Sequence, residues 1–311
     1  MLFSARNLVL GLWLAHVSSC AYNATVCGSA PYTSPNGDLN FNANAWNADS
    51  QGFSCLSVQT SPPAFDSTWA WSSNPNQVHS YPHVKFKLPD LPVLLSNISA
   101  LSLSAQWSMG PGSTPLPALS VDISGLADAD TTANVAFDMF ADPNPANAQN
   151  ETLAATEIMI WLGYVGTPVP LGFSSKRTCF NQMLGTLEFI LYQGKNSRGT
   201  DVFTWMATTN ETSFSAEISP LLQYLWRNGL VPSNSSLGLV EFGSEAYHSE
   251  SNVTFSATSF DAELVTGAAP NLTIASLPTA CSDAGSARRQ GSWLLSRVSI
   301  LGILGYVLYL I

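Results

Sequence analysis

The sequence has 311 residues and a formal net charge of −10 at pH 7, from 21 acidic and 11 basic side chains. So few cations cannot neutralise a row of phosphates, which excludes nucleic acid as a partner. Charged residues make up only 10% of the chain, against about 25% in an average soluble domain. This composition is typical of an extracellular, glycosylated β protein.

The first segment, residues 1–21, is expected to be a signal peptide. Arg6 precedes the apolar run 8–17, and small residues lead up to Ala21, near which we expect cleavage. The apolar run is too short to span a bilayer. We therefore expect the mature protein to be secreted.

Four cysteines remain once Cys20 leaves with the signal peptide, an even number that suits disulfides in an oxidising compartment. There is no C-x-x-C pair, and His79 and His83 flank Pro82 and cannot lie one helical turn apart. The sequence thus predicts neither a metal nor a cofactor. The remaining cysteines are Cys27, Cys55, Cys179 and Cys281.

Seven N-x-S/T sequons form a dense set for a chain of this length, and we expect about half of them to carry glycan. Their asparagines are Asn23, Asn97, Asn150, Asn210, Asn234, Asn252 and Asn271.

Residues 22–266 show short alternating strands broken by clusters of Gly, Pro, Asn and Ser, which predicts a single all-β domain, a sandwich or jelly roll. One segment differs, because residues 218–228 have apolar side chains at helical spacing and Gly229 follows as a stop signal. We expect this one helix to pack on the convex sheet. Strands are expected at residues 101–107, 135–140, 157–162, 187–192, 203–207, 237–242 and 252–260.

The C-terminal part is expected to contain a spacer, residues 267–290, and a hydrophobic tail, residues 291–311. The last apolar run, 298–311, is short for a membrane-spanning helix. Small residues at 282–286, a polar spacer and a terminal apolar tail follow the order of a GPI-attachment signal, in which the tail is removed. An ordinary short tail anchor is the alternative.

Two strands carry candidate chemistry. Alternation from Glu157 puts Glu157, Met159 and Trp161 on one face and apolar residues on the other, which predicts an inner strand whose polar face lines a cleft. A second strand, residues 239–247, is expected to put Glu241, Gly243, Glu245 and Tyr247 on one face, and Gly243 to leave room for a sugar ring. A third strand carries Asp138. The alternative is that these are solvated surface carboxylates.

Several motifs in one order make the sequence resemble glycoside hydrolase family 12. They are NANAWN (42–47), WAWSSNPNQVHSY (69–81), ANVAFDMF (133–140), EIMIWLG (157–163) with Pro170 and Gly172 downstream, and FGSEAY (242–247). The resemblance spans residues 27–260. It implies a β-jelly roll of two curved antiparallel sheets whose concave face binds a linear β-1,4-glucan, cleaved with retention of configuration.

The resemblance also implies roles for residues. Glu157 corresponds to the nucleophile and Glu245 to the general acid/base, with Asp138 beside the nucleophile and sharing a hydrogen bond with it. Environments must then push the two pKa values apart. Asn44, Trp46, Met159, Trp161 and Pro170 are the expected substrate-binding residues, with Trp46 and Trp161 stacking on glucosyl faces.

The spacing of Cys27 and Cys55 fits the disulfide of this family, and Cys179 and Cys281 would then form the second pair. Ser244, Tyr247 and Asn47 depart from the family's usual Thr, Phe and Gly. Glu241 stands where a neutral amide is expected, and it could raise the pKa of Glu245 by repulsion or simply reach solvent.

Two alternatives stay open. One is an enzyme strictly specific for xyloglucan, and the other is a non-catalytic glucan-binding or elicitor-like surface protein. The retention of Glu157, Glu245 and Asp138 argues against the second. In either case we expect a monomer without cofactors. Trp69 and Trp71 share a strand face and are expected to be core residues.

Overall fold

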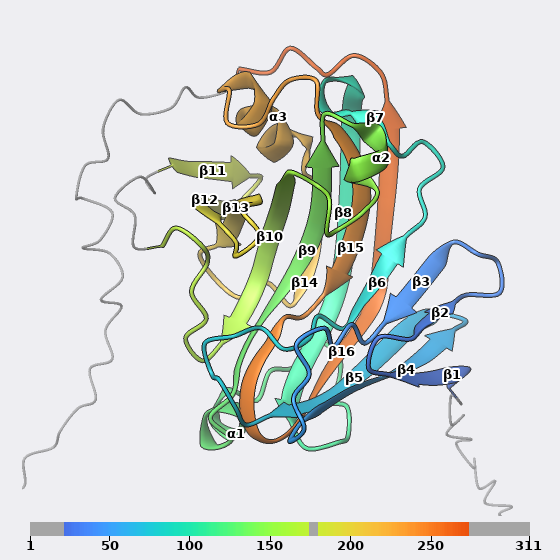
Figure 1. Cartoon of the computed structure of the whole chain (residues 1–311), viewed down its shortest axis with the longest axis vertical. Coiled ribbons are helices and arrows are strands. Elements are labelled where there is room, and N and C mark those ends of the chain that lie inside the picture. Colours follow the sequence, from blue (N-terminus) through green and yellow to red (C-terminus); the bar gives the residue numbers. More distant parts are fainter. Residues whose placement is uncertain (1–21, 174–179, 274–311) are drawn as a thin grey trace, which may run out of the picture.

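The structure is a computed structural model that describes residues 22–173 and 180–273. Two stacked sheets form it, and strand β16 runs through both (Figure 1). The cleft sheet runs in the order β2 (Pro31–Thr33), β3 (Leu39–Asn42), β6 (His83–Phe86), β15 (Ser236–Gly243), β9 (Thr132–Asp142), β10 (Thr156–Val165), β13 (Asp201–Ala207), β12 (Leu187–Lys195) and β11 (Phe180–Leu184), with β7 (Val93–Leu94) pairing one end of β15.

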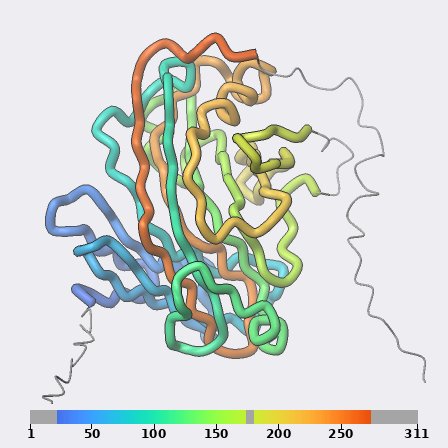
Figure 2. The backbone as a smooth tube through the Cα atoms, turned by 180° about the vertical axis from the view of Figure 1, so that it is seen from behind, coloured from blue at the N-terminus to red at the C-terminus, as the bar shows by residue number. Residues whose placement is uncertain are grey.

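The back sheet runs in the order β1 (Ala24–Cys27), β4 (Phe53–Thr60), β5 (Pro63–Trp71), β16 (Ala246–Thr266), β8 (Ile98–Pro111) and β14 (Ser213–Glu217). Figure 2 shows β8 and β16 extending along the whole back of the molecule. Neighbouring strands are antiparallel, except that β10 and β13 are parallel. The jelly roll predicted from the alternating strands is confirmed, and all seven predicted strands lie within observed ones.

Alternation along the strands creates the core between the sheets. Ile158, Ile160 and Leu162 of β10 point into this core, as expected, together with Trp69 and Trp71 of β5, which are fully buried. The opposite face of β10 carries Met159 and Trp161 in a second, smaller apolar cluster under the cleft, with Ala136, Tyr192, Val202 and Met206. The central strand is therefore buried on both faces.

The predicted helix is α3 (Ser219–Arg227), with Pro220 in its first turn and Gly229 at φ 70° just beyond its end. It contacts β8 of the back sheet, as expected, and Tyr224 also stacks on Phe180 of the cleft sheet at 3.8 Å between ring centroids. Three short helical segments were not predicted, because each is too short to show a period. They are α1 (Ile123–Asp128), α2 (Pro145–Ala148) and a 3₁₀ turn (Leu95–Asn97).

Cys27 and Cys55 form the expected disulfide, which joins a directly paired position of β1 and β4. Cys179 and Cys281, the signal segment 1–21 and the tail 291–311 lie outside the described residues. The chain stays attached beyond β16, since the backbone N–H of Gly267 donates to Asn97 and that of Ala269 donates to Ser96.

The strand predicted at residues 239–247 is interrupted. β15 ends at Gly243, Ser244 and Glu245 form a break, and β16 begins at Ala246. The sequence analysis expected Gly243 to make room for a sugar, and this is wrong. A Cβ at Gly243 would lie 2.2 Å from the carbonyl oxygen of Pro82, so the space beside it is already filled. The glycine instead allows the segment before β6 to pack directly on β15.

Candidate active site

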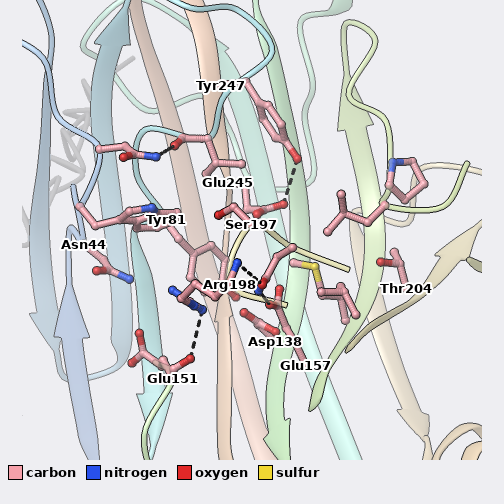
Figure 3. A pocket seen from close by; sticks show the side chains of 18 of the residues that line it. Asn44, Tyr81, Asp138, Glu151, Glu157, Ser197, Arg198, Thr204, Glu245 and Tyr247 are labelled. Atoms are coloured by element: carbon pink, nitrogen blue, oxygen red, sulfur yellow. Dashed lines mark hydrogen bonds between the residues drawn. The ribbon is translucent and has the colours of Figure 1, made fainter. Parts of the chain in front are cut away.

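A cleft with a cavity volume of about 460 Å³ lies on the outer face of the cleft sheet. Its floor comes from neighbouring strands whose registers place side chains in rows. Asp138 of β9 is directly paired with Met159 of β10 on one side and with Glu241 of β15 on the other. Paired residues point to the same face of a sheet, so this row faces the cleft. Figure 3 shows Glu157 and Glu245 pointing into the same space.

Glu157 enters the cleft from the start of β10, two residues before Met159 and on the same face. The side-chain amide of Asn196 donates to its Oε2 at 3.4 Å. Burial raises the pKa of Glu157 to about 7, with Glu241 and Glu151 adding to the rise, while Arg198 and the Asn196 hydrogen bond lower it. The group is thus desolvated, but donors that favour its ionised form surround it.

Glu245 lies in the break between β15 and β16, and the side chain of Asn134 holds it at two points, in addition to a hydrogen bond from the Asn134 backbone N–H to the Glu245 carbonyl at 3.1 Å. The backbone N–H of Glu245 donates to Oδ1 of Asn134 at 3.0 Å, and the amide nitrogen of Asn134 donates to Oε2 of the carboxyl. The hydroxyl of Tyr247 donates to the same oxygen at 3.2 Å. Burial and the nearby charge of Glu157 raise the pKa of Glu245 to about 7, against the two hydrogen bonds.

The two carboxyls therefore interact, but burial does not separate their pKa values, contrary to the sequence expectation. Both pKa values are raised to about 7. What distinguishes Glu157 from Glu245 is the environment of each. Asn196 and Arg198 stabilise the negative charge of Glu157, and that charge in turn raises the pKa of Glu245. These donors favour the ionised form of Glu157, and its charge favours the protonated form of Glu245.

Asp138 is only 6% exposed, and its Oδ1 has no hydrogen-bond partner among the described residues. Burial raises its pKa well above the usual range, with Glu157, Glu241 and Glu245 adding to the effect. The expected hydrogen bond between Asp138 and Glu157 is not formed in this structure. The raised pKa favours the protonated form of Asp138, which lies in the row beside Glu157.

Residues 37–265 match the family described as Glycosyl hydrolase family 12. This match covers more than half of the chain. The chain belongs to glycosyl hydrolase family 12. It is therefore a glycoside hydrolase.

Similar proteins agree with the family 12 assignment. A probable xyloglucan-specific endo-β-1,4-glucanase A of Aspergillus flavus is 28% identical over 79% of this chain and 93% of that protein. An inactive glycoside hydrolase, XLP1 of Phytophthora nicotianae, is 27% identical over 70% of this chain and 83% of that protein. The crystal structure of Trichoderma harzianum endoglucanase 3 superimposes with a TM-score of 0.64 at 24% identity, covering 78% of this chain and 97% of that one, which shows a shared fold.

The expected substrate-binding residues of this family 12 chain all line the cleft. Trp46 is 51% exposed at the rim, as a stacking platform requires, and Asn44 beside it has a positive φ of 43°. Trp161 differs from expectation, because it is only 2% exposed and its Nε1 lies 3.4 Å from the sulfur of Met159. It forms the wall of the cleft and offers no open stacking face. Pro170 lies between the exposed side chains of Val169 and Leu171.

Glu241 is neither at the surface nor a cause of the raised pKa of Glu245, so both sequence interpretations were wrong. It is 1% exposed, and its Oε1 forms an ion pair with the Lys85 ammonium at 2.8 Å. Nε2 of His83 lies 3.7 Å from the same oxygen. Burial raises the pKa of Glu241, while His83 and Lys85 oppose the rise.

Sequence reasoning missed several residues of the family 12 cleft. Asn196 and Arg198 belong to the turn between β12 and β13, whose polar sequence shows no period and whose partners lie far along the chain. Glu151 follows α2 in a similar turn. Asn134 and Tyr81 were detectable, because both lie inside motifs that carried the resemblance. The described residues contain no group of three or more His, Cys, Asp or Glu side chains placed to hold a metal ion.

Proposed function

We propose that this family 12 protein is a retaining endo-β-1,4-glucanase that hydrolyses cellulose-like, mixed-linkage or xyloglucan backbones. The observation that carries the proposal is the pair Glu157 and Glu245 in one cleft, close enough that the charge of one raises the pKa of the other. Retaining glycosidases use two carboxyls about 5–5.5 Å apart, one as nucleophile and one as acid/base.

In the proposed mechanism Glu157 attacks the anomeric carbon and forms a glycosyl-enzyme, while Glu245 protonates the leaving oxygen. Glu245 then takes a proton from the water that releases the sugar. The donors around Glu157 support the nucleophile role, because they stabilise a carboxylate. The charge of Glu157 supports the acid role of Glu245, because it favours the protonated carboxyl. The raised pKa of Asp138 favours its neutral form, which limits the negative charge beside the nucleophile.

Substrate binding is proposed to centre on Trp46, whose exposed indole suits the apolar face of a β-linked glucosyl unit. Asn44, Met159 and Pro170 line the same cleft. Two relatives are described as xyloglucan-specific endo-β-1,4-glucanases. They favour a more specific version of the proposal, in which xyloglucan is the only substrate. A reducing-sugar assay on xyloglucan, barley-type glucan and carboxymethylcellulose tests both forms, and NMR of the first product anomer tests retention.

A second candidate function is glucan binding without catalysis, which the inactive relative favours. The two candidates differ in one measurement on the wild-type protein. Binding of xyloglucan without any release of reducing ends, under conditions where a control endoglucanase acts, would support the binding protein and overturn the enzyme.

We further propose that the protein is secreted as a glycosylated monomer and held at the cell surface by a GPI anchor. Residues 1–21 and the order of the C-terminal segments support this. So does the exposure of six sequon asparagines, with Asn252 half-buried. Among the described residues, no helix has the length and apolar character to cross a membrane. Release by phosphatidylinositol-specific phospholipase C tests the anchor, and a mature protein that retains residues 298–311 would overturn it.

A further inference from the structure

We propose that Glu151 is an additional substrate-binding residue, a fixed carboxylate that accepts hydrogen bonds from glucosyl hydroxyls in the cleft. The proposal rests on the glucan specificity proposed above. Glu151 lines the same cleft as Glu157 and Glu245. Figure 3 shows it at the lower left of that cleft, apart from the group formed by Asp138 and Glu157. A sugar chain that reaches Glu157 and extends in this direction passes over Glu151.

The position of Glu151 is fixed at two points. Its side chain accepts a hydrogen bond from the Lys85 ammonium at 2.8 Å to Oε1, and its backbone carbonyl accepts one from Nη2 of Arg198 at 3.2 Å. Lys85 is in turn held by the buried carboxyl of Glu241 at 2.8 Å. A sugar hydroxyl therefore meets a group that has already lost much of its conformational freedom.

The charge of Glu151 suits the same role. Burial alone would raise its pKa, but Lys85, together with His83 and a hydrogen bond with Glu241, lowers the pKa of Glu151 below its usual value. The side chain is 33% exposed, so the ionised carboxylate can be reached from the cleft. An ionised carboxylate only accepts hydrogen bonds, and sugar hydroxyls are donors. The buried Glu241 contributes indirectly, because it pairs with Lys85, and Lys85 favours the ionised form of Glu151.

The alternative is that the Lys85–Glu151 pair only holds the turn after α2. A substrate with one hydroxyl removed separates the two cases. We would place Glu151→Gln in a Glu157→Gln background, which removes turnover, and measure binding of cellotetraose or a xyloglucan heptasaccharide by calorimetry. Binding of monodeoxy analogues of the same oligosaccharide would be measured with the Glu157→Gln protein and with the Glu151→Gln/Glu157→Gln double variant. Glu263→Gln on the exposed face of β16 is the matched control.

We expect Glu151→Gln to weaken binding of the parent oligosaccharide about 10- to 100-fold, the range for a hydrogen bond to a charged group. At least one deoxy analogue should show no further loss in this variant, and Glu263→Gln should change nothing. Unchanged binding, or the same loss for the parent and every analogue, would overturn the inference. Oligosaccharide binding without hydrolysis by the wild-type protein would overturn only the proposed function, and absence of all binding would overturn both.

Discussion

Asn134 holds Glu245 at both ends, accepting from its backbone N–H at 3.0 Å and donating to its carboxyl. Glu245 has no strand of its own to orient it, since it lies in the break between β15 and β16. Asn134 is fully buried on β9 and supplies the rigidity that the break lacks. The orientation of the proposed acid/base therefore depends on a residue from a neighbouring strand.

Replacement of Asn134 should reveal this dependence. Asn134→Ala removes a donor to the carboxylate form of Glu245, so the pKa of Glu245 should rise further and the basic limb of the kcat/KM profile should move to higher pH. We expect kcat to fall about 10- to 100-fold from loss of orientation. Ser244→Ala, which removes a hydrogen bond only to the backbone of Asn134, should leave the limb in place. An unshifted limb in Asn134→Ala would contradict this account.

The two proposed catalytic roles can be separated chemically. Glu157→Gln should abolish turnover of every substrate, because no glycosyl-enzyme can form. Glu245→Ala should lose activity on natural glucans but still react with a substrate whose leaving group needs no proton, and azide should then restore turnover. The product should be a β-glycosyl azide. An α-azide, or azide rescue of the Glu157 variant, would show that the roles are reversed.

Arg198 should set the acidic limit of activity. Its charge lowers the pKa of Glu157, so Arg198→Gln should raise that pKa and move the acidic limb of kcat/KM to higher pH, leaving less activity in acid. Lys195→Gln is the matched control, since Lys195 lies on the same hairpin but pairs with Asp201 at 2.6 Å. An equal shift in both variants would mean that only the overall charge of the hairpin matters.

The cleft carboxyls should make stability depend on pH. Folding raises the pKa values of Glu157 and Glu245 from 4.5 to about 7. The folded state thus binds more protons than the unfolded state between these values, so this contribution is full below about pH 4.5 and is lost as pH rises towards 7. Glu157→Gln should therefore raise the free energy of unfolding at pH 8 by about 1–3 kcal/mol and change it little at pH 4. Denaturant titration at both pH values measures this, and equal effects would contradict it.

The sequence predicted what depends on local periodicity. The face of β10 that carries Glu157 follows from alternation, and so does the burial of Trp69 and Trp71. The break at Glu245 was not visible, because alternation continues through it and the contacts made there, such as that of the Ser244 N–H with the Pro82 carbonyl, join residues distant in sequence.

The ion pair of Glu241 was equally hidden. It arises from the register of β15 against β6, which pairs Glu241 with Lys85, and no local pattern reports which strands become neighbours. The contact between Asn196 and Glu157 was hidden as well. Asn196 lies in the turn between β12 and β13 and Glu157 lies on β10, so the contact depends on β13 pairing with β10.

Strand β16 leaves the cleft sheet soon after Glu245 and continues in the back sheet, between β5 and β8. A single stretch of backbone thus belongs to the ladders of both layers. The two sheets therefore cannot shift relative to one another near Glu245 without breaking hydrogen bonds of β16. Through β16, substitutions in the back sheet can affect the position of the proposed acid/base, Glu245. A change on the far side of the back sheet that loosens β16 would act on Glu245 through the backbone, because β16 begins at the next residue, Ala246.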